Sequence, residues 1–294
     1  MLTTPAARAP LDPELLAATL VAPAGPLARL DVVARSGSTN TDLVAAVAAE
    51  PSAWQAPALL VADHQDAGRG RAGRVWHTPP RAALTSSLLV DPGVPPHRVP
   101  WLPLLVGLGV VRALRATTGL DAVLKWPNDV LLPAADAVDG WGPHRKVAGI
   151  LCEGLPDGRA VLGVGINVSQ GADELPVPSA TSLALAGAAT TDRGALLDAQ
   201  VREVLGVLDT WRAAGGDARA ARGATGGTLA DEVADVCATL GVRVAVDRVD
   251  GSVLVGTVTG LGPDGELVVR GADGVDVPVV TGDVRHVRAE NRTA

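Results

Sequence analysis

The sequence contains no phenylalanine and no tyrosine, and six tryptophans supply all of its large aromatic side chains. Any core must therefore be built mainly from aliphatic residues. With 47% hydrophobic and only 19% charged residues in 294 positions, the chain is too apolar to be intrinsically disordered. Its length suits one large domain, or a large domain with a small second one.

Positive charge is scarce as well. The chain has 32 acidic against 25 basic residues, a net charge of −7. Proteins that bind nucleic-acid backbones carry an extended basic face, so we expect no nucleic-acid partner and only a local anion site. The longest apolar run, residues 101–111, is interrupted by Pro103 and too short to cross a bilayer. The N-terminal residues lack a signal-peptide core, and we expect no membrane association.

Cysteine is limited to Cys152 and Cys237, which excludes a disulfide framework and a zinc-knuckle spacing. A reducing, cytoplasmic environment is expected. No pair of histidines has metal-ligand spacing, and the sequence contains neither a nucleophile elbow nor a phosphate-binding P-loop. Catalysis would then depend on fixed positive charge and positioning, which suits acyl or phosphoryl transfer with Mg-ATP.

Lysine is the rarest charged residue. Of the 25 basic residues 23 are arginine, and only Lys125 and Lys146 are lysine. An ammonium group is a compact point charge, whereas a guanidinium is a wide planar fork. Chance survival at the surface would explain one lysine, but both lie in motifs that also carry glycine, tryptophan or proline. The pattern favours positions at which an arginine does not fit.

Hydrophobic periodicity predicts both helices and strands. Helices are expected at residues 11–20, 42–50, 97–118 and 191–214. Strands are expected at residues 29–35, 58–62, 82–90, 147–152 and 160–168, with two extended pieces around Pro127. The Ala-, Asp-, Gly- and Pro-rich residues 133–145 read as a flexible loop. From residue 241, Val-rich segments separated by Asp-Gly turns predict a small antiparallel barrel, with a domain boundary near residue 236.

Residues 65–76 are the most unusual segment, because Gly68, Gly70 and Gly73 alternate with three arginines. Glycine lets the backbone approach a ligand, and guanidinium and N–H groups bind negative charge. The G-x-G-x-x-G spacing is a weak dinucleotide signal, because the prolines at 79 and 80 disfavour the helix that this motif requires. A solvated basic loop is the alternative, but ordering such a loop costs entropy that a bound anion would offset.

Four further motifs combine small or rigid residues with polar side chains. They are Ser38-Thr39-Asn40, K-W-P-N-D at 125–129, K-V-A-G-I-L at 146–151 and G-V-G-I-N-V at 163–168. Each has a plain structural alternative: a helix cap, a strand end with a surface lysine, or strands with glycine bulges. For 125–129 alone, the functional and structural readings are about equally balanced.

Together, in this order, the motifs resemble those of the biotin protein ligases over about residues 29–290. The resemblance implies an α+β fold: a mixed β-sheet catalytic domain flanked by helices, class II synthetase-like, at 1–236, and a small C-terminal β-barrel domain at 237–294. It implies activation of biotin with ATP to biotinyl-5′-AMP and pyrophosphate. Biotin is then transferred to a lysine of a carboxylase's biotin carrier domain. ATP and biotin would be substrates and Mg²⁺ a cofactor.

Site roles follow from the same resemblance. Lys146, Arg71, Lys125 and Asp129 would be catalytic, with Lys146 and Arg71 between the biotin carboxylate and the α-phosphate. Biotin would be bound by Ser38, Thr39, Asn40, Gln65, Gly68, Arg69, Gly70, Arg71, Lys146, Gly149 and Gly163. ATP would be bound by Arg71, Arg74, Trp76, Lys125, Asn128, Lys146 and Asn167. The metal ligands, the oligomeric state and the division of roles among Lys125, Asn128 and Asp129 stay open.

Other readings of the chain remain. Some members of this family carry an N-terminal helix-turn-helix domain and act as repressors, but only about 30 residues precede the first expected strand, so we expect a short form without it. A lipoate or octanoate ligase or transferase of the same fold is the nearest alternative within this chemistry. A non-catalytic ligand-binding module is the alternative outside it.

Overall fold

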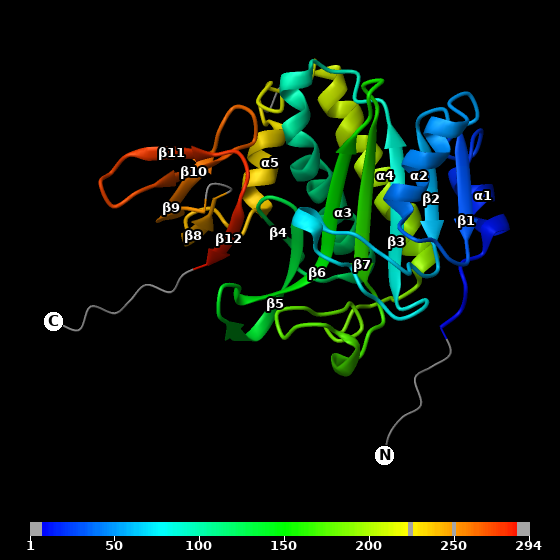
Figure 1. Cartoon of the computed structure of the whole chain (residues 1–294), viewed down its shortest axis with the longest axis horizontal. Coiled ribbons are helices and arrows are strands. Elements are labelled where there is room, and N and C mark those ends of the chain that lie inside the picture. The colour runs from blue at the N-terminus through cyan, green and yellow to red at the C-terminus, as the bar shows by residue number, and fades with distance from the viewer. Residues whose placement is uncertain (1–7, 223–225, 249–250, 287–294) are drawn as a thin grey trace. The chain divides into compact units, whose positions relative to one another are not determined.

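The structure is a computed structural model that describes residues 8–222, 226–248 and 251–286 (Figure 1). The chain forms two compact units. The first is Met1–Asp91, Ala148–Pro176 and Thr181–Ala199, and the second is Pro92–Val147, Val177–Ala180 and Gln200–Ala294.

The first unit contains a mixed sheet in the order β1-β2-β3-β7-β6. The strands are β1 (Arg29–Val33), β2 (Ala58–Ala62), β3 (Ala83–Val90), β7 (Ala160–Asn167) and, from residue 148 on, β6 (Gly142–Gly154). β1 and β2 are parallel, whereas β2–β3, β3–β7 and β7–β6 are antiparallel. β2 and β3 are buried along their whole length, as the continuous apolar run of β2 predicts. The predicted mixed sheet is confirmed.

Two helices of this unit begin at different kinds of cap. The helix α1 (Pro13–Leu20) starts at Asp12, whose carboxylate accepts hydrogen bonds from two backbone amides. The helix α2 (Thr39–Ala49) starts at Ser38, but the Ser38 side chain makes no capping hydrogen bond, so that part of the prediction is wrong. Instead, the carboxylate of Asp42 accepts hydrogen bonds from Ser36 and from the Gly37 amide.

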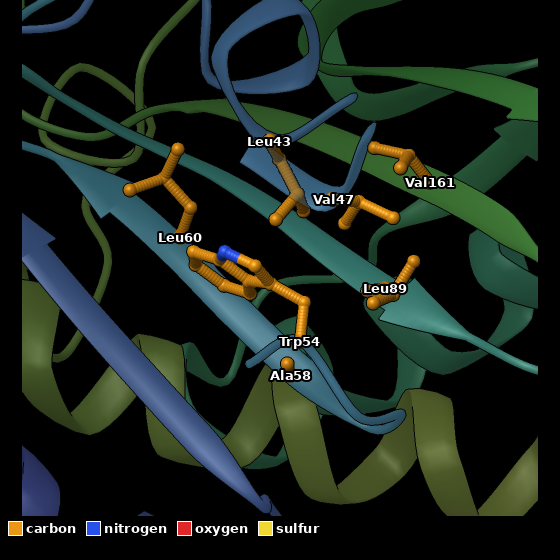
Figure 2. Close-up of a cluster of buried hydrophobic side chains, with 7 residues drawn as sticks. All are labelled: Leu43, Val47, Trp54, Ala58, Leu60, Leu89 and Val161. Carbon is orange, nitrogen blue, oxygen red and sulfur yellow. The ribbon is translucent and has the colours of Figure 1, made fainter. Parts of the chain in front are cut away.

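α2 covers one face of this sheet through an aliphatic cluster that includes one tryptophan. In Figure 2, Leu43 and Val47 of α2 face Leu60, Leu89 and Val161 of the strands. Trp54, which is 4% exposed, fills the space beside them. Burying aliphatic side chains of this size stabilises a fold by about 1.5–3 kcal/mol each. The cluster fixes α2, whose first turn carries the Thr39-Asn40 motif.

The second unit contains two long helical segments. The 3-10 turn η2 (Pro96–Trp101) leads into α3 (Leu102–Thr118), and α4 (Arg193–Ala213) belongs to this unit from residue 200. α3 approaches α4 so closely that a Cβ on Gly109 would lie 2.7 Å from the Cα of Val204. Pro96–Thr118 is long and apolar enough to cross a membrane by length and composition, but it is mostly buried in the fold. Its hydropathy is explained by core packing.

The second unit also contains β4 (Val123–Lys125) and β5 (Asp129–Val138), which pair with the first part of β6 in the order β6-β5-β4. Residues 133–145 are therefore not the predicted flexible loop: β5 continues to Val138 and β6 begins at Gly142, so the segment is a hairpin. Composition misled here because the alternating polar residues belong to an exposed ribbon rather than to a loop. The hairpin tip also accepts a backbone hydrogen bond, because the His286 amide donates to the carbonyl of Gly140.

After α5 (Leu229–Val236), which the sequence reasoning missed, five strands form an antiparallel sheet. They are β8 (Arg243–Asp247), β9 (Val253–Leu261), β10 (Leu267–Arg270), β11 (Asp276–Val279) and β12 (Asp283–His286), in the order β11-β10-β9-β8-β12. The predicted antiparallel strands are confirmed. The predicted barrel is not closed, because within the described residues β11 and β12 are edges that do not pair with each other.

Candidate functional site

A buried polar network lies at the start of α2 in the first unit. The side-chain oxygen Oε1 of Gln65 accepts hydrogen bonds from the Thr39 amide at 2.8 Å and from the Thr39 hydroxyl at 3.0 Å. Ser87 Oγ lies 2.8 Å from Thr39 Oγ1 and 2.6 Å from Asn40 Oδ1. All four residues are buried. The network therefore offers uncharged donors and acceptors in a place shielded from water.

Asn40 links this network to β6. Its amide nitrogen donates to the carbonyl of Leu151 at 3.1 Å and to the carboxylate of Glu153 at 2.7 Å. Gly163 of β7 leaves the space for the Asn40 side chain, because a Cβ on Gly163 would lie 2.2 Å from Asn40 Oδ1. Gly163, which the family resemblance assigns to biotin binding, is thus required to make room for the Asn40 side chain.

Ser87 and Glu153 are site residues that sequence reasoning missed. Ser87 is completely buried in β3, whose other residues are mostly apolar. Two consecutive serines in an otherwise apolar buried strand were the available signal, because a buried hydroxyl needs a hydrogen-bond partner. For Glu153 the sequence offered only its place at the end of a strand.

The glycine–arginine loop, residues 68–76, closes on itself. The Trp76 amide donates to the carbonyl of Gly68 at 2.8 Å, and the Gly70 amide donates to the carbonyl of Arg74 at 2.7 Å. The tip is the 3-10 turn η1 (Arg71–Gly73), with Ala72 at φ 53° and Gly73 at φ 72°. Residues 74–82, all described, contain no helix.

Glycines set how closely this loop packs. A Cβ on Gly68 would lie 2.4 Å from the Trp76 carbonyl oxygen and 2.8 Å from Gln65 Nε2, so glycine joins the loop to the buried network. The indole of Trp76 lies over Gly165 of β7, whose added Cβ would meet the ring at 2.7 Å. Arg69 reaches from the loop to the Thr41 hydroxyl at 3.2 Å and towards Glu153 at 3.4 Å. Arg74 is exposed and Arg71 half-buried.

In the second unit, an ion pair joins two of the predicted catalytic residues. The Lys146 ammonium lies 2.6 Å from Asp129 Oδ1, and their side chains are 26% and 14% exposed. The Lys146 backbone is held as well, since its amide donates to the carbonyl of Ser179 at 2.7 Å. A carboxylate that bonds to an ammonium fixes its position. Lys146 is therefore a held point charge.

Lys125 and Trp126 are both buried. The Lys125 ammonium donates to the carbonyl of Val284 at 2.6 Å and lies 4.6 Å from the centre of the Trp141 ring. The Trp126 indole donates to the carbonyl of Gly265 at 3.0 Å. Two of the five residues of the 125–129 motif thus contact β12 or the turn between β9 and β10, whereas Asp129 contacts Lys146.

The remaining predicted residues have varied surroundings. The Asn167 amide donates to the carbonyl of Thr181 at 2.9 Å, and its oxygen accepts from Gln170 at 2.9 Å, so this side chain holds the residues that follow β7. Gly149 lies in β6 opposite Gly165, and Asn128 is half-buried in the turn before β5. The structure thus brings together Ser38, Thr39, Asn40, Gln65, Gly68 and Gly163 in one unit, and Lys125, Asn128, Asp129 and Lys146 in the other.

Two groups near these motifs have displaced pKa values. Burial, with a smaller effect of Glu153, raises the pKa of the Cys152 thiol to about 12, so it is not a nucleophile at neutral pH. Burial, with smaller effects of Lys125 and His144, lowers the pKa of His286 to about 4. Within the described residues, no three His, Cys, Asp or Glu side chains cluster as metal ligands would.

Sequence comparison identifies relatives over nearly the whole chain. A profile described as the biotin/lipoate A/B protein ligase family matches residues 32–170, and one described as the biotin protein ligase C-terminal domain matches residues 239–287. A biotin--[acetyl-CoA-carboxylase] ligase of Mycobacterium tuberculosis is 37% identical, over 96% of this chain and 97% of the relative. A bifunctional ligase/repressor BirA of Bacillus subtilis is 34% identical over 47% of this chain and 42% of its own length.

Solved structures give the same result. A biotin protein ligase from Aquifex aeolicus in complex with biotin and ATP superposes with a TM-score of 0.68 at 25% identity, covering 88% of this chain and 99% of that one.

Proposed function

Because the chain belongs to the biotin protein ligase family, we propose that it activates biotin with ATP and attaches it to a lysine of a carrier domain. In the first step a biotin carboxylate oxygen attacks the α-phosphorus, and pyrophosphate leaves. In the second step the carrier lysine attacks the carbonyl carbon of the biotinyl-5′-AMP, AMP leaves and the amine loses a proton. The reaction forms a C–N bond.

One observation of the structure carries this proposal: the uncharged network of Gln65, Thr39, Ser87 and Asn40. A ureido ring is neutral, with two N–H donors and one carbonyl acceptor, and such a network can pair with it. Lipoate and octanoate have no polar group at that end. Bound there, they would form no hydrogen bond with these side chains, whereas a ureido ring would. The alternative substrates are therefore disfavoured.

Ser38, Gly68, Arg69, Gly70, Gly149 and Gly163 would shape this biotin site. Two supports lie in the structure: Gly163 admits Asn40, and Gly68 lets the glycine–arginine loop approach Gln65. Each of these glycines allows a close contact that a Cβ would prevent. The loop would follow the acyl chain of biotin to its carboxylate.

Adenylation needs fixed cations, because a carboxylate and a triphosphate repel each other. Arg71 would bind oxygens in bidentate fashion, and Lys146, held by Asp129, would neutralise charge developing at the α-phosphate. Arg74, Trp76, Asn128 and Asn167 would serve the nucleotide. A closed loop would keep water from the mixed anhydride, which otherwise hydrolyses.

Magnesium would enter as Mg-ATP. Mg²⁺ is usually held by substrate phosphates with one or two carboxylates, not by a protein cage. Asp129 is the acidic residue of its motif, and its charge is already compensated by Lys146. The metal would neutralise phosphate charge while the protein side chains hold the reactants.

The acceptor would be the biotin carrier domain of a carboxylase, in the cytoplasm. The name of the Mycobacterium tuberculosis relative supports the acceptor class. Both cysteines are free thiols, which suits a reducing compartment.

A ligation assay tests this function. The purified chain receives Mg-ATP, a carrier domain and one of biotin, lipoate or octanoate, and the product is measured by intact mass. We expect transfer of biotin alone, abolished when the acceptor lysine of the carrier is replaced by alanine. Transfer of lipoate or octanoate at a comparable rate would overturn the assignment.

A further inference from the structure

Lys125 lies in a motif otherwise linked to the reaction, yet its ammonium is directed at the C-terminal sheet. Lys125 is 5% exposed, and its Nζ donates to the backbone carbonyl of Val284 in β12 at 2.6 Å. The Trp141 ring, at the tip of the β5–β6 hairpin, lies 4.6 Å from the same Nζ. A buried ammonium needs such compensation, which a carbonyl and a π-face supply. The side chain is therefore committed to a contact between three segments of one unit.

The surroundings of this contact are basic. Burial first of all, and then the charge of Lys125 and the nearby His144, lower the pKa of His286, and burial lowers the pKa of His144. A neutral His286 ring adds no positive charge beside Lys125, whose ammonium bonds to the Val284 carbonyl and lies over the Trp141 ring. The hairpin tip is fixed at the same place, because the His286 amide donates to the Gly140 carbonyl at 3.0 Å.

The backbone links this contact to the ion pair. Lys125 ends β4 and Asp129 begins β5, and the two residues are direct cross-strand partners. The carboxylate of Asp129 is 2.6 Å from the Lys146 ammonium. A shift of Lys125 therefore shifts Asp129, and with it the cation that it holds.

Neighbouring bonds support the same geometry. The Trp126 amide donates to the Thr239 hydroxyl at 3.1 Å, and its indole donates to the Gly265 carbonyl. The Ala238 amide donates to the Leu124 carbonyl at 2.8 Å. The first two residues of the motif are thus attached to the chain after α5, and the last is attached to Lys146.

We propose that Lys125 is a positioning residue: it ties the 125–129 turn to β12 and so sets the position of the Asp129–Lys146 pair, without contacting the nucleotide. This inference rests on the proposed function for its kinetic consequence, but its structural part does not. The C-terminal sheet then contributes to adenylation through one ammonium.

Hydrogen exchange of the ligand-free protein tests the structural part. In Lys125→Met, which keeps the length of the side chain but removes the charge, we expect the β12 amides to exchange at least about tenfold faster. Arg285→Gln on the same strand is the matched control, because it removes only the exposed pair with Asp247 of β8. Unchanged exchange of β12 in Lys125→Met would overturn the proposal whether or not the protein ligates biotin.

Kinetics distinguish positioning from contact with the nucleotide. Trp141→Leu removes a partner of the ammonium outside the motif. The measurement is kcat/KM in biotin-dependent ATP–pyrophosphate exchange. If Lys125 is a positioning residue, Lys125→Met and Trp141→Leu should each lower this value by about ten- to a hundredfold. The double variant should then be no worse than Lys125→Met. Contrary to the expectation from lysine scarcity, Lys125→Arg should keep activity within about threefold of wild type, because arginine can still donate to the carbonyl and stack on the ring.

Direct contact between Lys125 and the nucleotide would give different kinetics. Near-wild-type kinetics of Trp141→Leu with a severe loss in Lys125→Met, additive in the double variant, would contradict positioning. So would a failure of Lys125→Arg accompanied by normal exchange of β12. A wild-type protein without exchange activity would refute the proposed function while leaving the hydrogen-exchange result to decide the role of Lys125.

Discussion

At the scale of single residues, the two lysines that the chain retains have different surroundings. Lys146 is partly exposed and paired with a carboxylate, whereas Lys125 is buried against a carbonyl and an indole. A side chain that acts on a reactant must be accessible to it, and one that joins elements of the fold is buried. Their scarcity in the sequence indicated that both matter, but only the structure separates the two roles.

Replacement of Lys146 should affect chemistry more than folding. We expect Lys146→Ala to lower the rate of biotin-dependent ATP–pyrophosphate exchange by about 10²–10³, since a contact to charge that develops in the transition state is lost. Lys146→Arg should also be poor, because its fork is wider than a slot built for an ammonium. Exchange kinetics and thermal melting measure the two effects separately. A Lys146→Arg variant with wild-type activity would refute the slot.

We expect protonation of His286 to account for part of the loss of folding stability at low pH. Its pKa is about 4 when folded and about 6.5 when unfolded, so the unfolded chain binds a proton first as pH falls. The contribution of His286 to the free energy of unfolding is constant above pH 6.5. It falls between about pH 6.5 and 4, and it is constant again below pH 4. The partly exposed ring limits the loss to about 1–2 kcal/mol.

Urea denaturation at several pH values measures this loss. His286→Gln should lose less stability than wild type between pH 6.5 and 4, and the two should run parallel below pH 4, where carboxylates dominate. Identical pH profiles for the two proteins would show that His286 titrates normally.

At the scale of elements, β7 positions the site through what it lacks. Gly163 and Gly165 leave room for Asn40 and for the Trp76 indole, from a helix and from a loop respectively. The sequence predicted the strand and its glycines, but not which side chains occupy the space, because long-range packing is absent from local patterns. Glycine in a strand indicates a close approach without naming the partner.

Gly163→Ala should displace Asn40 and weaken biotin binding. We expect the KM for biotin to rise by about tenfold or more, since the added methyl overlaps the amide and breaks its bonds to Ser87 and Glu153. Steady-state kinetics with varied biotin measures it. Gly154→Ala on β6 is the control, because its added Cβ has no neighbour within 4 Å. Equal KM values in both variants would contradict the packing argument.

The glycine–arginine loop should change its accessibility on ligand binding. Arg69 and Arg74 are exposed without ligand. We expect trypsin to cleave after these residues in the free protein, and cleavage to slow by at least about tenfold with biotin and ATP, because ordering the loop removes locally open states. Mass spectrometry follows the fragments, with cleavage at the exposed Arg270 as internal control. Equal cleavage of the loop in both states would refute its ordering.

At the scale of the whole molecule, local patterns predicted most elements and few of their connections. β2 was predicted to the residue, and β3 and β7 to within one. Residues 133–145 were misread, because an exposed ribbon has loop-like composition, and α5 was missed, because the preceding glycines hid the capping box at Thr228. The barrel was inferred from turn spacing, which cannot show whether edge strands meet.

Local patterns likewise predicted only part of the site. Motifs identified Thr39, Asn40 and Gln65, because their order along the chain resembles that of a family. Ser87 and Glu153 entered only through the fold, as partners of those residues. The domain boundary near 236 stays a prediction, although α5 ends at Val236 and β8 begins at Arg243.

The proposed chemistry requires that two cations, Arg71 and Lys146, act on the same carboxylate and ATP. A double-mutant cycle in biotin-dependent ATP–pyrophosphate exchange tests it most directly, with wild type, Arg71→Ala, Lys146→Ala and the double variant. If both cations stabilise the same transition state, each single change costs about 10²–10³ in rate, and the double variant loses clearly less than the product of the two. Losses that multiply fully, or a single variant with wild-type exchange, would contradict the account.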